Sequence, residues 1–151
     1  MTDLPSLLAP ISVAVAELNL DDPERAVREL NHAFPVQTME ALTAALLAAH
    51  AAGTLTPREG GAGIRFGRAA KPGQLPGGCS VDVVDIEGAG AAHTHPRGEV
   101  SWCVPLSGAP TFEGVRSGWA VLAPGSSHIP TVTGGRMLIA YWLPDGALTW
   151  S

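Results

Sequence analysis

The chain is poor in the residues that mark several large protein classes. Among its 151 residues there are only two cysteines, Cys79 and Cys103, which lie in different segments without the CxxC spacing of a zinc knuckle. A disulfide framework therefore has little support, and we expect two reduced, partly buried thiols.

Charge is also scarce. Only 15% of the residues are charged, and 14 acidic against 9 basic side chains give a net charge of −5 with no basic run. A surface that follows a phosphate backbone needs clustered Lys and Arg, so we expect no nucleic-acid partner. The 46% of hydrophobic residues favour a well-buried core over disorder. The length is typical of one main domain, which usually has roughly 100 to 200 residues.

Long uninterrupted apolar runs are missing as well. The first 18 residues, MTDLPSLLAPISVAVAEL, have no cationic start, and Pro5 and Pro10 break their apolar run. This pattern is typical of neither a signal peptide nor a membrane span. We therefore expect a cytoplasmic protein that has no membrane partner.

The first 53 residues are rich in Ala and Leu and predict two helices. In DDPERAVRELNHAF (residues 21–34) an Asp precedes Pro23 at a helix start, apolar residues recur every three or four positions, and Pro35 follows. In QTMEALTAALLAAHAAG (residues 37–53) the same spacing continues up to Gly53, a residue that commonly follows a helix end. We expect residues 1–53 to be a helical segment that packs on the rest of the chain.

From residue 54 onward, short β-type runs alternate with Gly and Pro. This pattern is typical of antiparallel sandwiches and barrels. The expected fold is mainly β, with a small antiparallel β-barrel over residues 54–151. The candidate strands are residues 63–69, 79–86, 91–96, 99–106, 110–114, 119–124 and 136–144.

The stretch AHTHPRGE (residues 92–99) predicts a metal site. Residues i and i+2 of a strand share a face, so His93 and His95 would both point inward while Thr94 points away. The Pro96–Gly98 turn would then bring Glu99 back beside the two imidazoles. Imidazole and carboxylate ligands suit a divalent transition metal and leave iron, manganese and zinc open. The alternative is a polar turn, because HxH pairs also occur by chance.

A second stretch, GWAVLAPGSSHIP (residues 118–130), provides His128 as a fourth candidate ligand. The combined pattern resembles the two motifs of the cupin superfamily. These residues are Gly88, His93, His95, Glu99 and Gly108, then Gly118, Pro124, Gly125 and His128. The resemblance implies a cupin-type, jelly-roll-like barrel. The loop that carries His128 is shorter than in the common form, and Thr131 and Val132 stand where an Asn is usual. His32 and His50 lie outside the motifs, so we expect a surface or capping role for both.

Three stretches carry a narrower resemblance over most of residues 54–150: LTPREGGAGIRFGRAAKP, HPRGEVSWCVPL and GWAVLAPGSSHIPTVTGGRMLIAYWLPDGALTW. They are similar to the 4-hydroxylaminobenzoate lyase family of nitrobenzoate degradation. The resemblance implies conversion of 4-hydroxylaminobenzoate to 3,4-dihydroxybenzoate with release of ammonia, and this overall change needs no redox cofactor.

That reaction would give roles to one acid and to several cations. Glu99 could shuttle protons if it is not a tight metal ligand. A benzoate carboxylate needs a cationic partner, and arginine is suited to bidentate capture. Arg58, Arg65 and Arg68 cluster in a Gly-rich segment and are the candidates. The alternative for each is a solvated loop face.

Aromatic residues are candidates for contact with a ring substrate. Trp102 lies three positions after Glu99, and Tyr141 and Trp142 are neighbours on the last long strand, so only one of these two can face inward. We expect Trp102 and Tyr141 to contact the substrate, with core packing as the alternative. Cys103 is expected to be a buried structural thiol because no base partner is visible.

Two other functions stay open at this point. One is a metal-dependent cupin dioxygenase that acts on an aromatic compound, and the other is a non-catalytic cupin that binds a small molecule. We expect a homodimer because small barrels have edge strands that must be covered. The helical segment could instead form a lid over the barrel.

Overall fold

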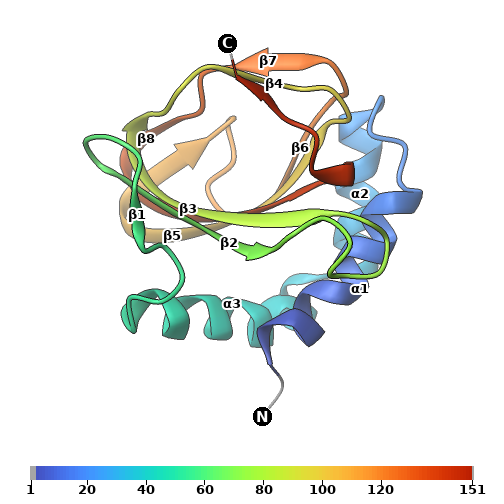
Figure 1. Cartoon of the computed structure of the whole chain (residues 1–151), viewed down its shortest axis with the longest axis horizontal. Helices are drawn as coiled ribbons and strands as arrows, with labels where there is room; N and C mark the ends of the chain where they lie inside the picture. The colour runs from blue at the N-terminus through green and yellow to red at the C-terminus, as the bar shows by residue number, and fades with distance from the viewer. Residues whose placement is uncertain (1–2, 151) are drawn as a thin grey trace.

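In the computed structural model, which describes residues 3–150, three helices precede an antiparallel β-barrel (Figure 1). The helices are α1 (Leu4–Glu17), α2 (Pro23–Ala33) and α3 (Val36–Ala51). The strands are β1 (Arg58–Glu59), β2 (Ile64–Ala70), β3 (Ser80–Ala89), β4 (His93–His95), β5 (Glu99–Phe112), β6 (Gly118–Leu122), β7 (Ser126–His128), β8 (Thr131–Leu143) and β9 (Thr149–Trp150). A short 3-10 turn, Pro144–Gly146, precedes β9.

The strands form two antiparallel sheets. The large sheet has the order β1-β2-β3-β8-β5-β6, and the small sheet has the order β7-β4-β9. The small sheet lies across the barrel from β2 and β3 (Figure 1). The mainly β, cupin-type barrel with an N-terminal helical segment is therefore confirmed.

Several elements differ from the sequence prediction. Helix α1 was not predicted, although Leu8, Ile11 and Val15 are buried at helical spacing and Pro5 lies in the first turn, where a missing N–H does no harm. The Asp3 side chain caps this helix by accepting a hydrogen bond from the Ser6 N–H at 3.0 Å. The predicted strands 99–106 and 110–114 form the single strand β5. Strands β1, β7 and β9 are too short to give a periodic signal.

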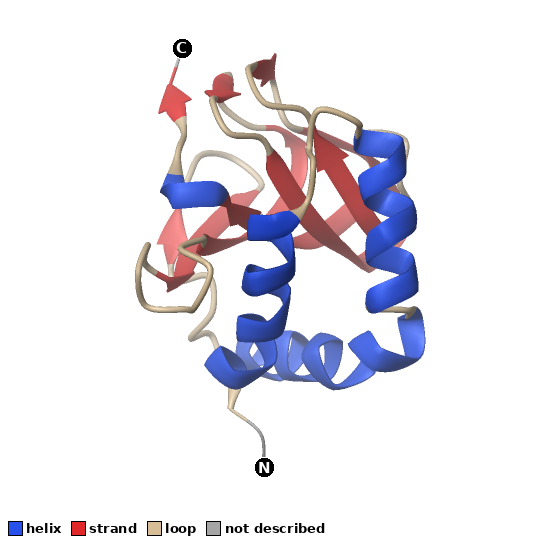
Figure 2. Cartoon of the chain, turned by 90° about the vertical axis from the view of Figure 1, so that its right-hand side faces the viewer, coloured by secondary structure: helices blue, strands red, loops and turns tan. Residues whose placement is uncertain are grey.

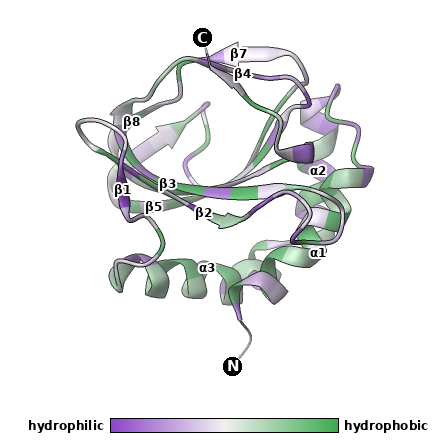
Figure 3. Cartoon of the chain, viewed as in Figure 1, coloured by the Kyte–Doolittle hydropathy of each residue, from purple (hydrophilic) through white to green (hydrophobic). Residues whose placement is uncertain are grey.

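The large sheet has a separate hydrophobic core on each of its faces. One face packs under the helices, which cover one side of the barrel (Figure 2). Helices α1 and α3 are coloured mostly hydrophobic, whereas α2 carries more hydrophilic residues (Figure 3). The other face points into the barrel and includes Cys103, Met137 and Ile139. Because helices and sheet share one core, the helical segment packs on the barrel; a domain boundary at residue 53 stays a prediction.

Alternation along β5 decides which side chains face the helices and which face the barrel. Trp102 faces the helices, where its indole N–H donates to the Thr43 hydroxyl of α3 at 3.0 Å. Trp119 of β6 packs beside it with ring centroids 4.8 Å apart. Glu99 and Cys103 lie an odd number of positions from Trp102 on the same strand, so they point to the opposite face, into the barrel interior. The helical layer therefore rests on an aromatic cluster.

His32 has the surface position expected from the sequence, whereas His50 contacts the large sheet instead of having a surface or capping role. The His50 imidazole at the end of α3 lies 2.7 Å from the Asp85 carboxylate of β3, which also accepts a hydrogen bond from Arg136 at 2.7 Å. His32 lies on the exposed side of α2. Within residues 3–150, no helix combines the length and hydropathy that a membrane crossing requires.

Candidate metal centre and cavity

Two short strands of the small sheet bring the predicted histidines together. Strands β4 and β7 pair antiparallel, and His93 lies directly opposite His128. His93 is 8% exposed and His95 is fully buried. Thr94 points the other way, where its hydroxyl lies 2.6 Å from that of Ser127. The predicted inward direction of both His93 and His95 is therefore confirmed.

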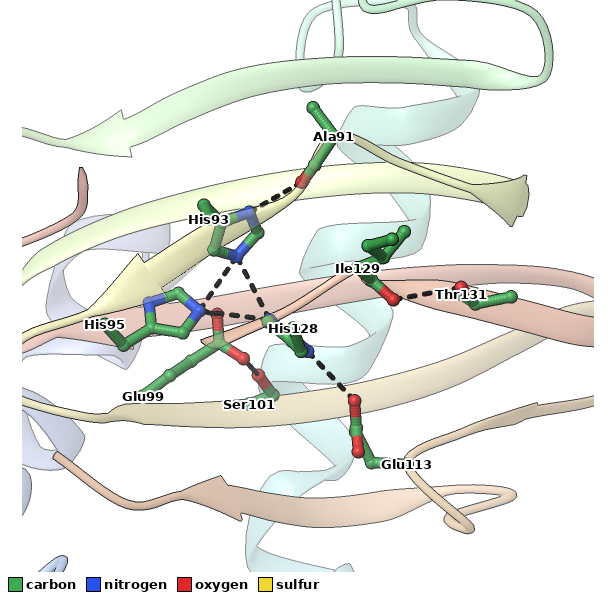
Figure 4. Close-up of polar contacts among 9 residues, drawn as sticks. All are labelled: Ala91, His93, His95, Glu99, Ser101, Glu113, His128, Ile129 and Thr131. Carbon is green, nitrogen blue, oxygen red and sulfur yellow. Dashed lines mark hydrogen bonds and ion pairs between the residues drawn. The ribbon is translucent and has the colours of Figure 1, made fainter. Parts of the chain in front are cut away.

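The three imidazoles converge through their Nε2 atoms (Figure 4). The Nε2 atom of His93 lies 2.9 Å from that of His95 and 3.0 Å from that of His128. The Nε2 atoms of His95 and His128 are 3.2 Å apart. This histidine cluster is the group of residues that could hold a metal ion.

Contacts on the far side of two rings fix where their protons lie. The Nδ1 atom of His93 lies 2.9 Å from the Ala91 carbonyl oxygen, and that of His128 lies 2.9 Å from a Glu113 carboxylate oxygen. Both partners accept only, so each Nδ1 carries the proton and each Nε2 presents a lone pair. Such outer contacts orient histidine ligands in metal sites. The buried Nδ1 of His95 has no partner within residues 3–150.

Burial keeps His93 and His95 neutral. It lowers the pKa of His95 to about 3, with a further contribution from the other two imidazoles. Burial also lowers the pKa of His93 below its ordinary value. Neutral imidazole is the form that binds a metal ion. His93 and His95 are therefore suited to act as ligands at neutral pH.

The donor set fits a metal ion on two further grounds. The Nε2 lone pairs of His93 and His128 face each other at 3.0 Å, a repulsive arrangement that a cation between them would relieve. Metal–nitrogen bonds of about 2.1 Å place nitrogens about 3.0 Å apart at right angles and about 3.4 Å apart at tetrahedral angles. The observed 2.9, 3.0 and 3.2 Å are closest to the first value. The spacing is therefore compatible with three nitrogens around one metal ion, and it leaves iron, manganese and zinc open.

Glu99 lies beside the cluster rather than within it. Its Oε1 atom is 3.3 Å from Nε2 of His95, and its Oε2 atom accepts a hydrogen bond from the Ser101 hydroxyl at 3.0 Å. Burial raises the pKa of Glu99 to about 7, and the Ser101 hydrogen bond opposes that shift. The carboxyl can therefore hold a proton near neutral pH. The structure brings together three of the four predicted ligands and places the fourth in contact with His95.

A cavity of about 840 Å³ opens from the cluster into the barrel. His93, Glu99 and His128 line it. Its walls are largely apolar, and the aromatic rings among them are Phe66, Phe112, Tyr141 and Trp150. A cavity of this size and composition suits a small aromatic molecule.

The structure separates the three candidate arginines. Arg58 and Arg68 line the cavity, but Arg65 does not. Arg65 alternates to the other face of β2 and donates to the backbone carbonyls of Thr56 and Pro57. Arg68 makes two hydrogen bonds, of 2.8 and 3.2 Å, with the Asp82 carboxylate. Arg58 has no ion pair among the described residues and is the free cation of the three.

A row of polar side chains crosses the large sheet from Arg68 to Glu99 beside the histidine cluster. Arg68 pairs with Asp82, Asp82 with Tyr141, and Tyr141 with Ser101 across neighbouring strands. Ser101 then contacts Glu99. Burial, with the charges of Asp82 and Glu99, raises the pKa of Tyr141 well above its ordinary value. Tyr141 therefore stays protonated and can act as a hydrogen-bond donor.

The structure differs from the sequence prediction at two aromatic positions. Trp102 faces the helices rather than the cavity, so its position does not fit the expected substrate contact. Trp150 lines the cavity, and its ring centroid lies 5.5 Å from that of His93. Sequence analysis missed it because β9 has only two residues. Burial raises the pKa of the Cys103 thiol to about 12, which fits a structural role.

An antiparallel barrel with histidines of two separate motifs turned into its interior is a cupin. A family model described as PnbB: 4-hydroxylaminobenzoate lyase matches residues 9–150. The chain belongs to this family.

Curated relatives and solved structures give more distant matches. A 4-hydroxylaminobenzoate lyase from Nocardioides sp. (strain LMS-CY) is 35% identical over 65 residues, and one from Pseudomonas putida is 34% identical over the same length. Each match covers 40% of this chain, and the chain spans only 38% and 37% of these relatives.

Among solved structures, an RmlC-like cupin from Ralstonia eutropha has a TM-score of 0.47 at 10% identity, covering 64% of each chain. An RmlC-like cupin from Shewanella frigidimarina has a TM-score of 0.40 at 18% identity, covering 58% of this chain and 81% of its own.

Proposed function

We propose that the protein is a metal-dependent lyase that converts 4-hydroxylaminobenzoate, or a related hydroxylamino-aromatic acid, to 3,4-dihydroxybenzoate and ammonia. The observation that carries the proposal is one cavity with a histidine cluster on its wall and a free arginine on its rim, in a chain of the 4-hydroxylaminobenzoate lyase family. The overall change adds one water molecule to the substrate and releases one ammonia. The overall change is therefore redox-neutral and needs no external oxidant or reductant.

The histidine cluster would hold the metal. When bound, a divalent metal ion supplies Lewis acidity, which polarises the N–O bond of a hydroxylamino group. His93, His95 and His128 are nitrogen donors that suit iron, manganese or zinc. The contact of His93 with the Ala91 carbonyl and that of His128 with Glu113 keep the Nε2 atoms of these two rings directed at one point.

Glu99 is the proposed acid and base. The reaction must protonate a leaving oxygen and later remove a proton from the ring carbon that gains a hydroxyl group. Glu99 lines the cavity beside His95 and is buried, so it can hold a proton and release it without exchange with bulk water. Ser101 orients this carboxyl by its hydrogen bond.

Arg58 is the proposed partner of the substrate carboxylate. It lines the cavity and has no competing ion pair among residues 3–150, so its guanidinium is available for two parallel hydrogen bonds. Arg68 has two of its donor nitrogens engaged by Asp82, and it contributes less free charge. Arg65 faces away and is left out of this role.

The aromatic ring would lie against the apolar walls. Phe66, Tyr141 and Trp150 line the cavity from three different strands. Trp150 stands beside His93, so a ring held there would be close to the histidine cluster. The Tyr141 hydroxyl can donate to an oxygen of the substrate or product.

The decisive experiment is an anaerobic assay of purified protein of known metal content with 4-hydroxylaminobenzoate. We expect ammonia and 3,4-dihydroxybenzoate to form in equal amounts without oxygen. The His95→Ala variant serves as the inactive control. Product formation that requires oxygen would support the dioxygenase alternative. Tight binding of the aromatic acid without turnover would support a non-catalytic cupin.

A further inference from the structure

Glu113, a residue outside both cupin motifs, touches the histidine cluster from behind. It follows β5 in the loop that leads to β6, 15 positions before His128 in the chain. Its Oε1 atom accepts a hydrogen bond from Nδ1–H of His128 at 2.9 Å (Figure 4). The side chain of His128 is 13% exposed and that of Glu113 is 38% exposed. The contact is therefore partly shielded from solvent.

The backbone at Glu113 has a conformation that glutamate rarely adopts. Its φ is 50°, and that of Gly114 is 76°. Phe112 and Val115 exchange backbone hydrogen bonds of 2.9 and 2.8 Å around this pair. Two positive φ values inside such a pair define a tight turn in which Asn-Gly or Asp-Gly is strongly preferred. A glutamate at the first position is unfavourable for the turn itself, so a contact made by its side chain is the simplest reason for it.

That contact differs from the others behind the cluster. His93 is held by a backbone carbonyl, and Nδ1 of His95 has no partner within residues 3–150. Among the described residues, Glu113 is thus the carboxylate that contacts an Nδ1 atom of the histidine cluster. A carboxylate in this position fixes the tautomer and ring orientation of a ligand histidine and makes its Nε2 a stronger donor.

We infer that Glu113 is a positioning residue that holds His128 as a metal ligand. The inference rests on the proposed function, because it assumes that the histidine cluster binds a metal. Three neutral imidazoles leave the full charge of a divalent ion uncompensated. Glu113 brings carboxylate charge into contact with one of these imidazoles.

The test compares Co²⁺ binding by the purified native protein, after chelator treatment, with that of three variants. Glu113→Asn introduces a residue that the turn prefers, shortens the side chain by one methylene group and replaces the carboxylate by an amide. Glu113→Gln keeps the length and an acceptor oxygen but removes the charge. Glu29→Gln on α2 is the matched control, because it alters an exposed acid that pairs with Arg25, away from the histidine cluster.

We expect Glu113→Asn to weaken Co²⁺ binding about 10- to 100-fold and to change the visible Co²⁺ spectrum, with a smaller effect for Glu113→Gln. The melting temperature of the metal-free Glu113→Asn variant should equal or exceed the native value, since Asn suits the turn. If the Glu113→Asn variant binds Co²⁺ within about twofold of the native affinity, the inference about Glu113 is wrong, but the proposed function still stands. A native protein that binds no divalent metal would overturn the proposed function together with it.

Discussion

At the scale of single residues, the site depends on which nitrogen of each imidazole carries the proton. The Ala91 carbonyl and the Glu113 carboxylate hold the protons of His93 and His128 on Nδ1, so both Nε2 lone pairs face the cavity. The His95 ring has no such partner, but it is completely buried between the other two and Glu99. Its orientation is therefore fixed by packing.

The first residue-scale prediction concerns His95. Replacing it by Ala removes the ligand atom that contacts both other Nε2 atoms and Glu99. We expect the His95→Ala variant to bind its metal at least about 100-fold more weakly, because even outer contacts of ligands contribute 10- to 100-fold. Metal analysis after gel filtration measures this.

The matched control is His32→Ala, which alters an exposed histidine of α2. Circular dichroism shows whether each variant folds. Native metal content in a folded His95→Ala variant would contradict the assignment.

The second residue-scale prediction separates the arginines. Arg58→Ala should lower kcat/KM for an aromatic acid about 10- to 100-fold, chiefly through KM, because it loses charge-assisted hydrogen bonds of about 1.5 to 3 kcal/mol. Arg65→Ala should stay near native, since Arg65 points away from the cavity. Steady-state kinetics with a substrate that lacks the carboxylate is the control, and there Arg58→Ala should have little effect. Equal losses for the two variants would contradict this assignment.

At the scale of elements, strand register decides what each motif residue contacts. The pairing of β4 with β7 sets His93 opposite His128, although 35 positions separate them in the chain. The pairing of β5 with β8 sets Ser101 opposite Tyr141. On β5, a period of two sends Glu99 and Trp102 to opposite faces, so the same strand supplies the cavity and the support for the helices.

The element-scale prediction concerns that support. Trp102→Phe removes the hydrogen bond to Thr43 that ties β5 to α3. We expect a loss of about 1 kcal/mol in the free energy of unfolding, measured with urea. KM for the substrate should not change, because Trp102 does not line the cavity.

Thr43→Val provides the matched test of this contact. A double-mutant cycle should show that the two substitutions are not additive. A large rise in KM for Trp102→Phe with unchanged stability would restore Trp102 as a substrate contact and contradict the structural assignment.

At the scale of the whole molecule, the contact between His95 and Glu99 joins the two sheets of the barrel at the histidine cluster. Its histidines lie on the small sheet, whereas Glu99 and Ser101 belong to the large one. A metal bound by the three histidines would connect β4 and β7 and should stabilise the folded state.

The whole-molecule prediction follows from this linkage. At a metal concentration of 100 times Kd, the free energy of unfolding should rise by about 2.7 kcal/mol relative to the metal-free protein. Thermal melts with and without added Mn²⁺, repeated with the His95→Ala variant, measure the effect. An identical melting temperature of the native protein at all metal concentrations would contradict a folded-state metal site. The homodimer also stays a prediction, which light scattering after gel filtration would test.

Local rules were enough for part of the site. The period of two along HTH placed His93 and His95 on one face, and the downstream Pro-Gly-His predicted His128 as their partner, as the structure confirms. The same period of two places Trp102, three positions after Glu99, on the other face of the strand, which is where the structure has it. No local signal pointed to Glu113, because the contact with His128 exists only once β7 lies beside the end of β5.

The sequence by itself determined the antiparallel barrel, the helical segment and the histidines of the cluster, since these depend on spacing along one strand or on motifs within a few residues. Only the tertiary structure decided that Arg58 is free while Asp82 holds Arg68, that Tyr141 and Trp150 line the cavity, and that Glu113 supports His128. Each of these facts depends on register between distant strands. Register is set by the packing of both sheet faces at once, which no single segment of sequence contains.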